Sequence, residues 1–171
     1  LMDFSVYEES LKDTAKYQKA REFFAGKFAG EDVGEALIKD YKKKTVTPAS
    51  KEVRISLGGE LSSMAVEQFV RQKGISENTL FLGAFSYTLG KFSGENKSLF
   101  CTVNNGRHTV NMANSTGMFV RTLPIYHSWE ESVSVERYLQ NFQEEFYAVM
   151  SHDCISFAEL AKDYGIASDI L

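Results

Sequence analysis

Three segments of the chain repeat apolar residues at helical spacing. Glu8 to Phe28 does so through four residues that stand three or four positions apart: Tyr17, Ala20, Phe24 and Phe28. A second helix is predicted from Ser62 to Lys73, just before Gly74, and the clearest periodicity runs from Val135 to Met150. Such spacing puts an apolar stripe on one face of a helix, so each segment is predicted to pack on a core.

A fourth helix is predicted to follow Ser76, because serine is a preferred N-cap. This segment is apolar on nearly every face, with its large residues at 80, 81, 82, 85, 87, 89 and 92. A helix that is hydrophobic all round is typical of a protein interior. We therefore expect it to be the most buried helix of the chain. A short last helix is expected from Ser156, whose spacing to Glu159 is that of a capping box.

Three segments are strand candidates. Lys51 to Leu57 alternates apolar and polar residues, which predicts a half-buried strand, and Ser98 to Asn104 and Met118 to Tyr126 are predicted as two more. The charged stretch from Glu31 to Ser50 is interpreted as a linker. Because strands and helices interleave along the chain, the predicted architecture is α/β layering.

Composition restricts the classes of function. The 171 residues carry a formal net charge of −4, whereas nucleic-acid binding depends on clustered Lys and Arg, so no nucleic-acid partner is expected. No apolar stretch approaches the roughly 18 residues that span a bilayer, so no membrane partner is expected either. Cys101 and Cys154 stand in unrelated contexts, which favours a reducing, cytoplasmic location with two structural thiols.

Histidines offer little chemistry in this sequence. None of His108, His127 and His152 has a second histidine or a cysteine at a metal-ligand spacing, so no metal site is predicted. His152 lies just past the helix predicted from Val135 to Met150, where it interacts with the negative end of the helix dipole. That structural role is favoured over a role in binding.

Amides and arginines gather in the segment from residue 103 to residue 124. Arg107 follows a glycine at the end of a strand, and its side chain there either reaches over a cleft or bonds loop carbonyls. Arg121 alternates with large apolar residues, a costly place for a charge unless it is paired or wet. Either that face borders a channel, or the strand is an edge from which Arg121 snorkels into water, and the edge is favoured.

Three motif-like stretches follow one another along the chain. LMDFSVYE at 1–8 is similar to a YxDFAVW motif, TGMFVRT at 116–122 to GxFVNT, and HDCISFAE at 152–159 more distantly to HQDYPFE. In order and spacing they resemble the motifs of the condensation domain of non-ribosomal peptide synthetases, within the chloramphenicol-acetyltransferase-like superfamily. The segments 74–94 and 103–108 match as well, so the likeness covers essentially the whole chain.

The chain departs from that family pattern at several positions. Arg121 replaces the asparagine of GxFVNT, and Ser156 and Ala158 replace the proline and glutamate of HQDYPFE. The HHxxxDG signature, which carries the family's catalytic histidine, does not occur in these 171 residues. The resemblance therefore implies a piece of such a domain that holds no catalytic residue and is inactive alone.

The resemblance implies an incomplete α/β lobe of the chloramphenicol-acetyltransferase type, in which helices pack on a mixed sheet in two layers. Residues 1–171 would be part of one condensation-type domain, mostly its C-terminal lobe. Residues 1–50 would form the inter-lobe helix and linker, and residues 51–171 the core of the lobe. A tunnel between the two lobes would be lined in this chain by four residues: Asn105, Arg107, Arg121 and Thr122.

The activity implied is amide bond formation between acyl and aminoacyl thioesters, an acyl transfer in secondary metabolite biosynthesis. The partners implied are peptidyl carrier domains, which bear the 4'-phosphopantetheine, and the missing N-terminal lobe of the same domain. No cofactor would bind this chain directly. Half of a two-lobe enzyme would expose apolar surface and unpaired sheet edges, so self-association or marginal stability is expected.

Two alternatives stay open. An epimerisation domain or a coenzyme A-dependent acyltransferase shares the fold, and half a domain does not separate these reactions. The second alternative is a non-catalytic carrier-interaction module, supported by Arg121 and by the weak third motif.

Overall fold

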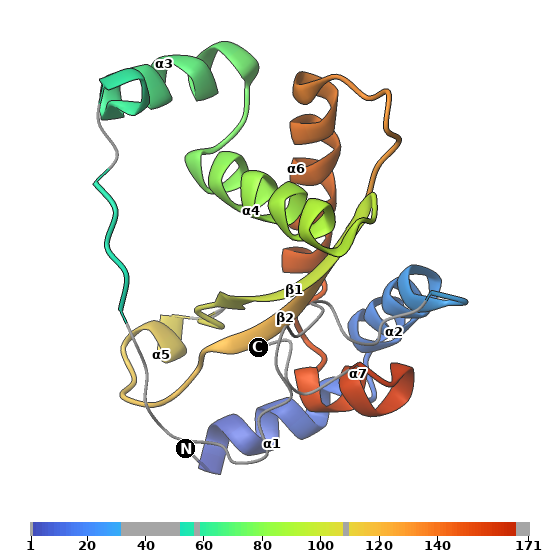
Figure 1. Ribbon diagram of the computed structural model, residues 1–171. Coiled ribbons are helices and arrows are strands. Elements are labelled where there is room, and N and C mark those ends of the chain that lie inside the picture. The colour runs from blue at the N-terminus through green and yellow to red at the C-terminus, as the bar shows by residue number, and fades with distance from the viewer. Residues whose placement is uncertain (1, 32–51, 57–58, 108–109, 167–171) are drawn as a thin grey trace.

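The computed structural model describes residues 2–31, 52–56, 59–107 and 110–166. Their elements follow one another along the chain (Figure 1) in this order: α1 (Met2–Leu11), α2 (Ala15–Phe28), the 3-10 turn η1 (Gly59–Leu61), α3 (Ser63–Lys73), α4 (Glu77–Ser93), β1 (Lys97–Asn104), α5 (Val110–Ala113), β2 (Arg121–Ser128), α6 (Val135–Ser151) and α7 (Phe157–Tyr164). The predicted α/β class is confirmed. The linker predicted from Glu31 to Ser50 lies, but for its first residue, outside the described residues.

An antiparallel pair of strands organises the described fold. β1 pairs with β2 from Lys97↔Ser128 at one end to Asn104↔Arg121 at the other. In Figure 1, α3 and α4 lie to one side of this pair, and α1, α2 and α7 lie to the other. α4 packs against β1 and α6, and α6 and α7 pack against β2.

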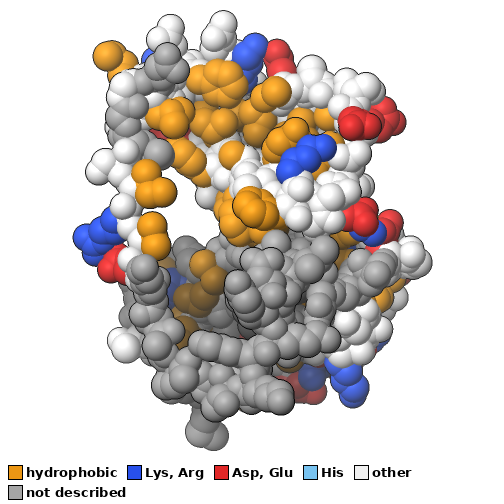
Figure 2. Space-filling model, viewed as in Figure 1, with side chains coloured by type: hydrophobic (Ala, Val, Ile, Leu, Met, Phe, Trp, Pro, Cys, Tyr) orange, Lys and Arg blue, Asp and Glu red, His pale blue; other side chains and the backbone are white. Residues whose placement is uncertain are grey.

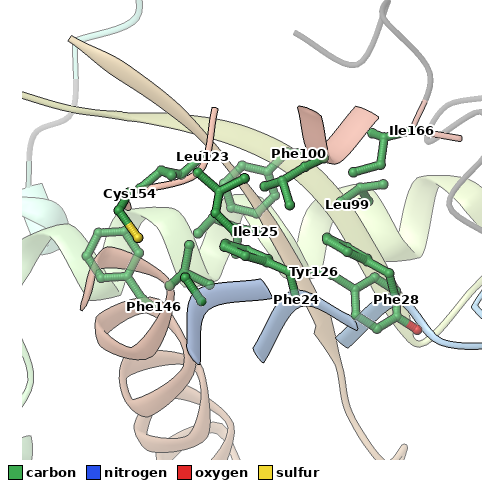
Figure 3. Close-up of a cluster of buried hydrophobic side chains, with 14 of the residues drawn as sticks. Phe24, Phe28, Leu99, Phe100, Leu123, Ile125, Tyr126, Phe146, Cys154 and Ile166 are labelled. Carbon is green, nitrogen blue, oxygen red and sulfur yellow. The ribbon is translucent and has the colours of Figure 1, made fainter. Parts of the chain in front are cut away.

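The main core lies where α2, α6 and α7 meet the two strands (Figure 3). Leu123 and Ile125 of β2 have no exposed surface, and neither do Phe24 of α2 and Phe142 of α6. The α2 stripe predicted from the sequence is confirmed, since all four of its residues are buried. At roughly 1.5–3 kcal/mol for each large apolar side chain, this burial holds the helices on the strands.

The first predicted helix is in fact two helices. Thr14 interrupts it, because its side chain accepts a hydrogen bond from the Tyr17 amide and so caps α2. The Thr14 hydroxyl also donates to the Leu11 carbonyl, 2.6 Å away, at the end of α1. A threonine that satisfies both helix ends separates α1 from α2.

The other predicted helices are confirmed with their caps. Ser62 and Ser76 cap α3 and α4, and Gly74 closes α3 in the left-handed conformation with φ of 65°. Ser156 and Glu159 form the predicted capping box of α7. Helix ends follow from a few neighbouring residues, so local sequence specifies them.

The prediction that α4 is the most buried helix is wrong. Its buried residues are Thr79, Gly83, Ser86 and Gly90, and its large residues Phe81, Phe85 and Phe92 are 49%, 48% and 78% exposed. The small face is buried because other groups come very close to it. A Cβ at Gly83 would lie 2.8 Å from Leu139, and one at Gly90 only 2.4 Å from Trp129.

Two strand predictions also need correction. Residues 52–56 are extended but pair with no described strand, and Val53 and Ile55 are 73% and 79% exposed. β2 begins at Arg121 and not at Met118, because residues 118–120 precede the register with β1. An alternating pattern indicates which residues share a face, but only a partner strand makes a strand of it.

Hydrophobic side chains gather on the surface over α3 and α4 (Figure 2). Within the described part of the chain, no helix is long and apolar enough to cross a membrane.

Candidate functional site

The four residues predicted to line a channel lie at one end of the β1–β2 pair. Arg121 pairs with Asn104 and Thr122 with Val103, at the last two positions of the ladder. The chain then continues from β1 directly into Asn105 and Arg107. The structure therefore brings all four predicted positions to one edge of the fold.

Gly106 permits this arrangement. It has φ of +65°, and a Cβ added there would lie 1.9 Å from the Phe119 carbonyl oxygen. Only glycine combines that backbone conformation with so close an approach. Gly106 thus fixes the start of the loop against the segment that leads into β2.

Arg107 is turned toward its own loop. Its guanidinium donates to the carbonyls of Met112 and Ser115, the latter at 2.8 Å, and to that of Gly117 at 3.4 Å. It also lies over the Phe119 ring, 4.3 Å from the ring centre. A planar fork of donors suits such a set of carbonyls. Arg107 therefore holds the loop from residue 112 to residue 119 in shape.

Arg121 does not snorkel into water. Its side chain is only 9% exposed, and it donates to the Glu8 carboxylate of α1 at 2.8 Å. The prediction that Arg121 snorkels into water is therefore wrong, although β2 has only β1 beside it in the described sheet. The cost of placing a charge beside Leu123 is offset by pairing, and the pair ties α1 to β2.

A second polar contact next to Arg121 was not predicted. The Asn104 amide donates to Asp153 at 2.8 Å, and Asp153 is 1% exposed. Asp153 follows α6, so this bond joins the end of β1 to the end of α6. Neither Glu8 nor Asp153 carries a sequence signal for this role, because Glu8 lies 113 residues from Arg121.

Of the four predicted residues, Asn105 and Thr122 have the side chains that take least part in the contacts that hold the fold together. Asn105 is exposed, and its side-chain oxygen accepts a hydrogen bond from the Arg107 amide at 2.9 Å. Its NH2 group takes no part in that bond. Thr122 is half-buried and faces away from Arg121 along the strand. Both can offer hydrogen bonds to a polar ligand.

The described histidines are engaged structurally. His152 Nδ1 donates to the Ala148 carbonyl at 2.7 Å, and its ring stacks on Phe23 at 4.3 Å. His127 is 2% exposed and its Nδ1 lies 2.7 Å from Glu145, whose other oxygen binds Lys27. His108 lies outside the described residues. Among residues 2–31, 52–56, 59–107 and 110–166, no cluster of His, Cys, Asp and Glu could hold a metal ion.

Comparison with protein families gives a match along nearly the whole chain. The family model described as Condensation domain matches residues 2–170. Among curated proteins, tyrocidine synthase 2 of Brevibacillus parabrevis is 29% identical over 165 residues, 96% of this chain and 5% of that protein. Surfactin synthase subunit 1 of Bacillus subtilis (strain 168) is 24% identical over 98% of this chain and 5% of its own length.

Solved structures have the same fold. The first condensation domain of the calcium-dependent antibiotic synthetase, in complex with a substrate analogue, aligns with a TM-score of 0.76 at 16% identity, over 97% of this chain and 38% of that one. The SgcC5 protein from Streptomyces globisporus gives 0.76 at 19% identity, over 96% and 37%. The chain thus spans under two-fifths of these solved chains and about a twentieth of the curated relatives.

Proposed function

The chain belongs to the condensation-domain family of non-ribosomal peptide synthetases, and from this we propose that it forms one wall of a site that makes amide bonds between carrier-bound thioesters. The observation that supports the proposal is the group formed by Asn105, Arg107, Arg121 and Thr122 at the Asn104↔Arg121 end of the strands, here called the polar edge. Asn105, just after β1, and Thr122 of β2 present an amide and a hydroxyl group there, at the end of a core whose Leu123 has no exposed surface. Polar pantetheine or peptide groups are suitable ligands for such an edge.

Within this wall we assign two kinds of role. We assign contact with the pantetheine or peptide groups of the substrate to Asn105 and Thr122. Neither side chain takes part in the ion pair and carbonyl contacts that hold Arg107 and Arg121. The two arginines shape the wall: Arg107 through the carbonyls of its loop, and Arg121 through Glu8 of α1. They are positioning residues in this proposal.

The chemical step needs a base, and we assign that role to no residue in the described part of the chain. General-base help to an attacking amine is worth about two to four orders of magnitude and requires hydrogen-bond reach to the nucleophile. The sequence has no HHxxxDG, and His127 and His152 are held by Glu145 and Ala148. We therefore expect the isolated chain to form no amide product.

The test uses the full polypeptide that contains these residues, with donor and acceptor carrier domains loaded with aminoacyl groups. Product is measured by mass spectrometry. Asn105→Ala and Thr122→Val should each lower the rate about fivefold, the effect of one hydrogen bond of about 1 kcal/mol. Ser128→Ala, at the opposite end of β2, is the matched control and should leave the rate unchanged.

The products distinguish the family's reactions. An amide between the two loaded groups supports the proposal. An inverted donor stereocentre without amide formation would indicate an epimerisation domain, and acylation that uses coenzyme A in place of a carrier would indicate a stand-alone acyltransferase. Absence of all three from the full polypeptide would leave a carrier-interaction module.

Self-association is part of the same proposal. Phe85 and Phe92 of α4 and Ile55 of the extended segment are large apolar groups that are 48–79% exposed, which is the kind of surface that another protein segment covers. Light scattering after size exclusion should give more than one copy for the isolated chain, and Phe85→Lys should shift it toward monomer. A monodisperse monomer of the unaltered chain would contradict the expectation.

A further inference from the structure

A groove of about 340 Å³ lies between α4 and the start of α6. Its walls include the rings of Tyr87, Trp129 and Tyr138 and the aliphatic groups of Leu80, Val133 and Leu139. Trp129 follows the Lys97↔Ser128 end of the paired strands, whereas the polar edge is at the Asn104↔Arg121 end. Seven residue steps of about 3.4 Å separate the two ends by roughly 24 Å, so the groove is a separate site.

The aromatic walls are fixed before any ligand arrives. The Tyr138 ring stands edge-on to Tyr87 and to Trp129, with ring centres 5.8 Å and 5.3 Å apart. Its hydroxyl donates to the Gly83 carbonyl at 2.9 Å. Trp129 in turn packs on Gly90, where a Cβ would lie 2.4 Å from the indole. A groove with preset walls loses little entropy when it is filled.

Two opposite charges belong to the lining, Lys91 and Glu131. Both residues are exposed. Lys91 Nζ donates to the Asn96 side chain at 3.0 Å and lies 5.4 Å from the centre of the Tyr87 ring, so the ammonium is held beside the aromatic wall. A ligand with only a positive or only a negative charge would lie near a side chain of the same sign at this site, either Lys91 or Glu131. Bringing like charges together is unfavourable.

From these charges and rings we propose that the groove binds a zwitterion with a bulky apolar side chain, namely a free aromatic or branched α-amino acid. Its carboxylate meets Lys91, its ammonium meets Glu131, and its side chain lies among the three rings. The volume is at the lower end of small-molecule sites, which suits a ligand of that size. The proposal does not depend on the function assigned to the polar edge.

The test exploits the single tryptophan of the chain, Trp129. Bromine quenches indole fluorescence on contact, so para-bromo-L-phenylalanine should quench Trp129 saturably. The same ring without the ammonium (para-bromophenylpropanoate) and without the carboxylate (para-bromophenethylamine) should require about two- to fivefold higher concentrations, the effect of one exposed ion pair. The titrations can use the chain in any oligomeric state, because one copy supplies the whole groove.

Charge variants give the decisive signature. Lys91→Gln should make the amine the best ligand, and Glu131→Gln should make the propanoate the best. Ala84→Leu, which fills the groove from α4, should abolish saturable quenching, and the surface variant Lys162→Gln should change nothing. Quenching that rises linearly with concentration and equally for the three probes would overturn the proposal and leave the groove as a protein contact. So would a ligand preference that is unchanged by both charge variants.

Discussion

Replacing Gly106 by alanine should destabilise the fold at the Asn104↔Arg121 end of the paired strands. Two costs add at this position. The left-handed backbone, with φ of +65°, costs an alanine about 1–2 kcal/mol. The new Cβ would also lie 1.9 Å from the Phe119 carbonyl oxygen. The backbone must shift to relieve this clash. Such overpacking costs about 1–3 kcal/mol, so the total expected loss is about 2–5 kcal/mol.

The fold supplies a matched control for this substitution. Gly94 has φ of +73°, but a Cβ there would meet nothing within 4 Å. Gly94→Ala should therefore pay only the backbone cost of about 1–2 kcal/mol. Urea unfolding followed by circular dichroism gives both free energies, and their difference isolates the collision with Phe119. Equal losses for the two variants would show that the loop does not approach Gly106 as closely as described, and would refute the reasoning.

Three further predictions concern the polar contacts. In a double-mutant cycle, Glu8→Gln and Arg121→Gln should show a coupling free energy of about 1 kcal/mol, because Glu8 is 43% exposed and partly screened. Additive losses of stability would show that this ion pair does not tie α1 to β2. Burial acts to raise the pKa of Glu159, but hydrogen bonds from Tyr17 and Ser156 outweigh it and lower that pKa. The carboxylate therefore stabilises the fold above its unfolded pKa of about 4.3, and this contribution is lost as the pH falls through the lower folded value. The deficit of Glu159→Gln in urea unfolding should consequently be larger at pH 7 than at pH 3. Burial raises the pKa of the Cys101 thiol to about 11, so a disulfide reagent at pH 8 should label it roughly 100-fold more slowly in the folded chain than in urea; equal rates would contradict this.

The sequence predicts those features of this fold that depend on neighbouring residues. The Ser156–Glu159 capping box begins α7, and the left-handed Gly74 ends α3. In both cases the residues that set the helix end lie within one turn of it. Most of the stripe of α6 also behaves as predicted, since Phe142 and Val149 are buried, although Val135 at its start is 71% exposed. Its polar residues fix the outer face, so one orientation of this helix is clearly best.

Features that depend on distant residues were not predictable. α4 has apolar residues on several faces, and its orientation is decided by where Leu139 and Trp129 come close to Gly83 and Gly90. The sequence indicates that Arg121 needs a partner, but Glu8 is one of many exposed carboxylates until the fold brings it within 2.8 Å. The four positions of the polar edge could be predicted from the family motifs, and the bonding of Arg107 to loop carbonyls, one of the two alternatives for this residue, is confirmed. Which carbonyls accept these bonds could not be predicted.

The burial of small residues on α4 explains how this helix comes so close to the end of the paired strands. Glycine in a helix interior costs about 1 kcal/mol relative to alanine, and α4 carries Gly83 and Gly90 on the same buried face. In return the helix lies close enough to α6 and to the Lys97 carbonyl for Trp129 to pack on it. That closeness makes the floor of the groove, and it leaves Phe85 and Phe92 outside.

At the far end of the strands Gly106 permits a similar approach to Phe119, and between the two ends Leu123 and Ile125 are wholly buried. A packed core of this kind deforms little, so under the two proposals a ligand bound at one end of the strands should leave the other end unchanged.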